Sequence, residues 1–164
     1  MSDVLAFILP CFYALATTVS FGLVFNIRGK HLLIAGIDGA VGWMVYSGLE
    51  GVFTSDIPQY FLATVALALY AEIAARIFKA PTILYLAGSL IPLVPGGGVY
   101  YTMEYCINGE VDAALATGLH TLGIAGALAM GIIVVSSFFR IQVNLRRERH
   151  LKRKLSLRRH PDQK

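Results

Sequence analysis

A proline–glycine element near residue 95 is the stretch whose backbone chemistry departs most from that of a plain apolar helix. Its candidate substrate-binding residues are Pro92, Pro95, Gly96, Gly97, Gly98 and Tyr100. The two prolines lack the N–H groups that a continuous helix would donate to Gly88 and Ile91, so these carbonyls are predicted to be free. Such a break is tolerated in lipid only where protein, water or a ligand meets it. The element is therefore either a substrate site in a discontinuous membrane helix or a packed proline kink.

Two titratable residues inside apolar runs are candidates for proton coupling. Asp38 lies near the middle of the second run, where a charge costs about 2.5 to 3.5 kcal/mol on insertion scales, so it must be protonated, paired or hydrated. A desolvated carboxyl group can take up and release a proton, whereas the alternative is a structural hydrogen bond to a neighbouring helix. His120, with Thr117 and Thr121, lies in the last run. It is either a proton carrier or a bonded structural residue.

Two further features have simpler interpretations. Glu72 and Arg76 are four residues apart and share one helical face, which predicts an interfacial ion pair or a gate at the cytoplasmic mouth. Cys11 and Cys106 have neither metal-ligand spacing nor the density of a disulfide scaffold, so both are predicted to be structural. The sequence contains no nucleotide-binding loop, zinc pattern or nucleophile elbow. We therefore expect no enzyme activity, no metal and no cofactor.

The composition indicates a polytopic membrane protein. Of the 164 residues, 56% are hydrophobic, and the mean hydropathy is +0.64. The apolar residues come in runs of about twenty, the length that crosses a bilayer as a helix. The first run follows Met1-Ser2-Asp3, which carries no positive side chain, and it is too long for a signal peptide. It is therefore predicted to be a membrane span.

The predicted fold is an all-α integral membrane protein with five transmembrane helices, the fourth broken at residues 92–98. The spans are expected at about residues 4–25, 31–53, 58–78, 82–104 and 111–139. All 14 Lys and Arg residues then fall on one side of the membrane. The positive-inside rule therefore places the N-terminus outside and the C-terminus in the cytoplasm of a multi-pass cell-membrane protein. Glycines at intervals of three and four in the second and fifth spans predict close helix contacts.

The chain divides into a five-span transmembrane domain, residues 1–140, and a basic cytoplasmic tail, residues 141–164. A cation near an anionic membrane surface contributes about 1 kcal/mol to binding. The tail is therefore expected to bind anionic lipids, and we expect no nucleic-acid partner.

The P-x-x-P-G pattern of Pro92, Pro95 and Gly96, followed by Tyr100, resembles an element of the threonine/serine exporter family. Further similar positions are Val24, Phe25, Asn26, Gly39, Gly42 and Pro81. The resemblance covers about residues 10–140 and is closest to the small membrane component of the split, two-chain members. It implies export of threonine and serine, or of succinate in some split members, together with a larger membrane chain. Gly97 and Gly98 replace bulkier residues of some succinate-type members, so the substrate does not transfer with the fold.

The sequence thus predicts a membrane subunit of a secondary exporter of small carboxylates. Amides of residues 96–98 and the positive end of a half-helix would bind the substrate carboxylate. The carbonyls of Gly88 and Ile91 would receive an ammonium group, and Asp38 would carry the coupling proton. Five spans form half of an inverted repeat, so a second membrane chain is expected, and the isolated chain would form a homo-oligomer or aggregate. The alternative is a non-transporting assembly or regulatory subunit.

Overall fold

The structure is a computed structural model that describes residues 2–159, with side chains described for residues 7–143. All regular elements in this part of the chain are helical, which confirms the predicted all-α fold. In chain order they are α1 (Ser2–Val24), α2 (Lys30–Gly48), α3 (Ile57–Phe78), α4 (Ile83–Ser89), the 3₁₀ turn η1 (Ile91–Leu93), α5 (Gly96–Asn108) and α6 (Val111–Arg159).

The helix ends follow from local backbone chemistry. α2 ends at Gly48, five residues before the predicted end of the span, and a non-helical stretch with Gly51 at φ 81° follows it. α3 has a proline in its first turn, where the missing N–H does no harm, and Lys79 closes it in the left-handed conformation. Gly109, at φ 78°, ends α5 in the same way and lets the chain turn directly into α6.

Three helices contain segments long and apolar enough to cross a membrane: Phe7–Val24, Ile57–Phe78 and Val111–Val143. A fourth span results if Ile83–Leu93 and Gly96–Asn108, which meet at a bend of 51°, cross together. α2 is not among these candidates, since its 19 residues include Lys30, Asp38 and several glycines. Five membrane crossings and their orientation therefore stay a prediction.

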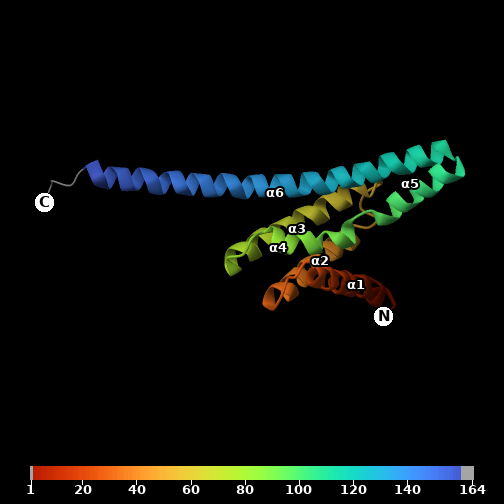
Figure 1. Cartoon of the computed structure of the whole chain (residues 1–164), viewed down its shortest axis with the longest axis horizontal. Helices are drawn as coiled ribbons and strands as arrows, with labels where there is room; N and C mark the ends of the chain where they lie inside the picture. The colour runs from red at the N-terminus through yellow and green to blue at the C-terminus, as the bar shows by residue number, and fades with distance from the viewer. Residues whose placement is uncertain (1, 160–164) are drawn as a thin grey trace.

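The helices pack as two groups that α3 joins. α6 packs on α3 and α5, whereas α2 packs on α1, α3 and α4. Figure 1 shows α5 folded back along the first part of α6, and the rest of α6 extending past all the other helices. Small side chains let α3 lie at the centre, and its fully buried residues are Ala63, Thr64, Leu67, Ala68 and Ala71.

The glycine faces make the close contacts that their spacing predicts. A Cβ atom added at Gly42 would lie 2.6 Å from the Leu67 side chain of α3. One added at Gly131 of α6 would lie 2.9 Å from Thr64 of the same helix α3. Real Cβ atoms do not approach other heavy atoms so closely, so these positions accept only glycine without a shift of the helices.

Candidate functional site

The proline–glycine element bends the chain by 51° between η1 and α5. Val94 is extended, with φ −63° and ψ 129°, and Pro95 precedes the first residue of α5. The prediction that Gly88 and Ile91 present unpaired carbonyls is wrong. Backbone N–H groups at the end of α4 bond to Gly88, and the Val94 N–H donates to Ile91 at 3.1 Å. Because the chain tightens into 3₁₀ geometry, bonds to the third residue replace the ones that proline removes.

The three glycines after Pro95 have different surroundings. Gly98 contacts Thr121 so closely that no Cβ atom fits between α5 and α6. Gly96 and Gly97 are exposed; a Cβ atom at Gly96 would meet nothing within 4 Å, and one at Gly97 would only touch Tyr101 at 4.0 Å. Helix packing thus accounts for Gly98 alone. The Gly96 N–H already donates to the Val94 carbonyl at 2.7 Å, so the Gly97 amide is the uncovered one of the two within the described part of the chain.

A pocket of about 240 Å³ lies between α1, α2 and η1. Its lining residues are Pro10, Tyr13, Ala14, Thr17, Trp43 and Pro92. Of the predicted substrate-binding residues, only Pro92 lines it. Tyr100 is exposed and borders a different hollow of about 260 Å³ along α5. The structure therefore separates the predicted substrate-binding residues into a pocket wall, an uncovered helix start and a helix contact.

A buried polar cluster lies where α1, α2 and α4 meet. Thr18, Asp38 and Ser89 are all 0% exposed. Neither carboxyl oxygen of Asp38 has a hydrogen bond to the described residues. Thr18 donates its hydroxyl to the Ala14 carbonyl at 2.9 Å, and Ser89 lies beside the carboxyl group but donates to Leu86 at 3.4 Å. Burial of a carboxyl group without a partner is costly, and the choice between proton coupling and a structural hydrogen bond for Asp38 stays a prediction.

The pocket and the buried cluster share α1 and α2, and their third elements, η1 and α4, are neighbours in the chain. On α2, Trp43 lies five residues beyond Asp38, about 7.5 Å along the helix axis. Ser89 of the cluster is the last residue of α4, and Pro92 of the pocket lies three residues later, in η1. α1 contributes Thr17 to the pocket and the next residue to the cluster. The pocket and Asp38 therefore lie about one and a half helical turns apart along α2, and Asp38 does not line the pocket.

The predicted pair of Glu72 and Arg76 is present on α3, with 3.6 Å between Arg76 Nη2 and Glu72 Oε2. The Arg76 guanidinium also lies 4.5 Å from the centre of the Phe139 ring of α6. The pair therefore helps to hold the end of α3 against α6. Its role as a gate stays a prediction.

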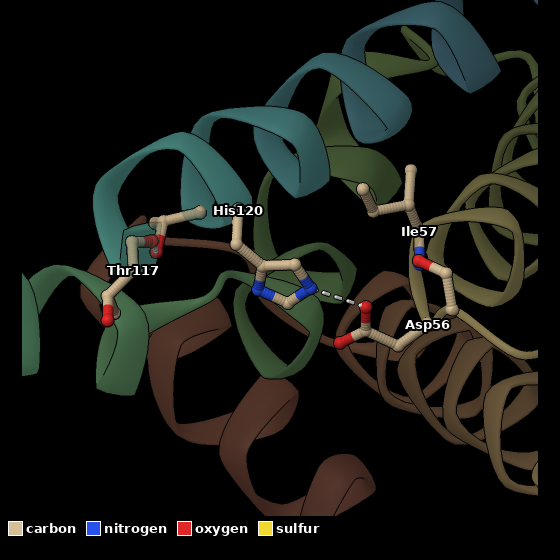
Figure 2. Close-up of polar contacts among 6 residues, drawn as sticks. Asp56, Ile57, Thr117 and His120 are labelled. Atoms are coloured by element: carbon tan, nitrogen blue, oxygen red, sulfur yellow. Dashed lines mark hydrogen bonds and ion pairs between the residues drawn. The ribbon is translucent and has the colours of Figure 1, made fainter. Parts of the chain in front are cut away.

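His120 contacts the start of α3 rather than Asp38. Its Nε2 atom lies 2.8 Å from Asp56 Oδ1, with side chains 50% and 33% exposed, respectively (Figure 2). Asp38, in contrast, lies within electrostatic reach of Tyr70. Tyr70 is fourteen residues beyond Asp56, which is about 21 Å further along α3. The structure thus does not bring the two candidate proton-coupling residues together.

Sequence reasoning missed several residues of the site. Thr18 and Ser89 of the cluster looked like ordinary small polar residues in apolar helices. Trp43 carries a buried indole N–H without a hydrogen-bond partner among the described residues. The only signal for it in the sequence is that it is the single tryptophan, inside a span. Each of these three residues belongs to the site because of its contacts with other helices. The spacing of residues along one helix does not predict such contacts.

Comparison with known families gives a match over most of the chain. A family model described as "Threonine/Serine exporter, ThrE" matches residues 10–138. The matched segment contains the pocket, the buried cluster and the proline–glycine element. No curated protein and no solved structure matched the chain. The family consists of transporters rather than enzymes, and the apolar helices agree with a membrane protein. The chain belongs to the threonine/serine exporter family.

Proposed function

We propose that this chain is the small membrane component of a secondary exporter of small carboxylates and works with a larger membrane chain of the same family. Threonine and serine are the first candidate substrates, and succinate is the second. The observation that carries the proposal is a fully buried Asp38, without a hydrogen-bond partner among the described residues, on the helix α2 that also borders the pocket against Pro92. Transporter sites commonly combine such a broken helix with a polar group deep in the membrane.

In this proposal the membrane is crossed five times, with α4, η1 and α5 forming one broken span. The N-terminus lies outside, because the Lys and Arg residues then all face the cytoplasm. α2 runs outward in this orientation, so the pocket lies on the outer side of Asp38. Residues 1–140 form the transmembrane domain of a multi-pass cell-membrane protein. Residues 141–164 form a tail that binds anionic lipids.

The substrate occupies the pocket with its hydroxyl group against Thr17. The positive start of α5, where the Gly97 amide is uncovered, does not line that pocket and is proposed as a second position, which binds the substrate carboxylate during transport. Pro95 fixes the start of that helix, and Tyr100 lies one turn further along it. The site is supported by the exposure of Gly96 and Gly97, since packing against neighbouring helices does not account for it.

Asp38 couples the transport to protons. Its unpaired carboxylate is unfavourable when dry, so a proton arriving through the pocket neutralises it, and its release resets the carrier. His120 as a second coupling residue stays a prediction, and its contact with Asp56 links α6 to α3.

Flux measurements on the complex test the proposal. The chain and the larger membrane chain are co-purified into liposomes, and the export of threonine, serine and succinate is driven by a pH gradient. Asp38→Asn, which keeps the size of the side chain but binds no proton, should abolish gradient-driven export and retain exchange of substrate for substrate. Ser137→Ala, an exposed position on α6, serves as the control.

The alternative function gives a different result in the same experiment. If the chain only assembles or regulates the complex, the larger chain alone should transport. Asp38→Asn should then leave gradient-driven export unchanged. Either observation would contradict the proposed transport role.

A further inference from the structure

A second set of polar residues leads from Asp38 toward the end of the bundle that carries Lys30 and Lys79. We propose that Tyr70, Tyr85 and His31 form the route by which the coupling proton leaves Asp38 for the cytoplasm. This inference rests on the proposed function, because it requires a proton on Asp38 during transport. It adds three residues from three helices to the site.

The cytoplasmic half of the proposed route is a direct contact between His31 and Tyr85. His31 Nδ1 lies 2.7 Å from the hydroxyl oxygen of Tyr85, and Tyr85 is 0% exposed. His31 itself is half-buried in the first turn of α2, beside the charged Lys30 and the Phe78 ring of α3. A buried tyrosine hydroxyl is therefore connected to the surface by a histidine, the side chain best suited to exchange protons near neutral pH.

Helical spacing places both ends of the route on one face of α2. His31 and Asp38 are seven residues apart, two turns and about 10.5 Å along the axis. Ala35, between them, is 0% exposed, so this face is covered by the neighbouring helices. His31 and Asp38 therefore lie on the same face of α2, which packs against the neighbouring helices.

Tyr70 of α3 is the proposed link between Asp38 and Tyr85. It packs against the same apolar cluster as Tyr85 and lies within electrostatic reach of both Tyr85 and Asp38. A hollow of about 130 Å³ borders it, lined also by Ile73, Ala74, Ile77 and Phe78. This hollow does not reach Asp38 or Tyr85. No hydrogen bond joins Tyr70 to Asp38 among the described residues, so the proposed transfer between them requires a bridging water molecule or a rotation of the Tyr70 ring.

The proton transfer balances without any other reactant. The protonated Asp38 gives its proton to the Tyr70 oxygen, directly or through one water, and Tyr70 passes its own proton to Tyr85 in the same way. The Tyr85 hydroxyl proton moves to His31 Nδ1, and His31 releases its Nε2 proton to cytoplasmic water. One proton leaves Asp38 and one enters solution. The other polar side chains of the cluster, Thr18 and Ser89, do not titrate.

Single-hydroxyl variants of the co-purified complex test the route. Tyr70→Phe and Tyr85→Phe keep the rings and remove one hydroxyl each, His31→Gln removes the titrating group, and Tyr105→Phe on α5 is the matched control. Gradient-driven export should fall about tenfold or more in the three route variants, a size typical of a lost positioned proton transfer. Substrate exchange, which needs no net proton release, should stay at the level of the unmodified complex. Unchanged export, or an equal loss of exchange, would overturn the inference.

Infrared spectroscopy separates the failure of the route from the failure of the proposed function. The carboxyl band that disappears in Asp38→Asn reports the proton on that residue. After a pH jump on the cytoplasmic side, loss of this band should be about tenfold slower in Tyr85→Phe and His31→Gln. If the complex exports no carboxylate but the band rate still depends on His31, the proposed function fails and the route stands. If export is normal and the carboxyl band disappears at the same rate in Tyr85→Phe and His31→Gln as in the unmodified complex, the route is wrong.

Discussion

Three consecutive glycines, at positions 96, 97 and 98, illustrate how residues of one type differ in role. Only Gly98 is held against another helix, where Thr121 leaves no room for a side chain. Gly96 and Gly97 face open space, so the fold itself does not require glycine there. Packing within the described chain therefore does not explain a bare backbone at these positions, and the proposed carboxylate site at the start of α5 would.

Substitution by leucine separates these roles. Gly97→Leu should abolish transport, because its side chain covers the first-turn amides, while insertion and thermal stability are retained. Gly98→Leu should instead lower the stability of the folded chain, because it forces α5 away from Thr121. Flux and thermal unfolding of both variants check this pair of outcomes. Normal export by Gly97→Leu would remove the carboxylate site from the proposal.

Cysteine labelling distinguishes water from lipid at the same position. In a chain with Cys11 and Cys106 replaced by serine, Gly97→Cys should react with a membrane-impermeant maleimide, since a substrate site must be hydrated. Ala68→Cys, at a fully buried position of α3, is the buried control and should stay unlabelled. A packed or lipid-facing kink predicts no labelling at position 97.

At the scale of the element, α2 combines a close packing face with a free end. Gly42→Ala places a methyl group against Leu67 and should destabilise the protein by about 1–3 kcal/mol, the usual cost of overpacking. Gly48→Ala meets nothing within 4 Å and should be neutral or slightly stabilising, since alanine is the better helix former. Thermal unfolding in detergent compares the two. Equal stability of both variants would show that the α2–α3 contact is looser than described.

The bend between η1 and α5 gives a second prediction at this scale. Replacing Pro92 and Pro95 with alanine restores two N–H donors, so the two half-helices should become straighter and the pocket wall should move. The distance between spin labels at Ile83 and Ile107, both exposed, should then increase in the variant and transport should fall. An unchanged label distance would mean that packing, and not proline, sets the bend of 51°.

Sequence reasoning reached the features that depend on one helix at a time. Spacing of four residues was enough to predict the ion pair of Glu72 and Arg76, and the chemistry of a lone carboxyl group was enough to select Asp38. It failed at Ile91, because a change to 3₁₀ geometry leaves no mark in the residue types. The contact of His31 with Tyr85 spans 54 positions, so it depends on how helices are placed against one another.

At the scale of the whole molecule, α5 has no buried residue and packs mainly on α6. Because α5 is so little covered by the rest of the described chain, we propose that a second membrane chain lies beside it. The isolated chain should form a homo-oligomer or aggregate and give no flux in liposomes, whereas co-expression with the larger chain should yield a stable complex. Size-exclusion chromatography and flux measurements check both. Export from liposomes that contain only this polypeptide would contradict the prediction.

The length of α6 has a mechanical consequence. At 49 residues the helix is about 74 Å long, far more than a bilayer is thick, and it runs without interruption from the turn after α5 into the basic segment (Figure 1). A tilt of its membrane part is therefore transmitted along a stiff lever to the end that carries the cations. If those cations bind lipid headgroups, as proposed, headgroup binding and the tilt of α6 against α3 are mechanically coupled, so a change in one changes the other.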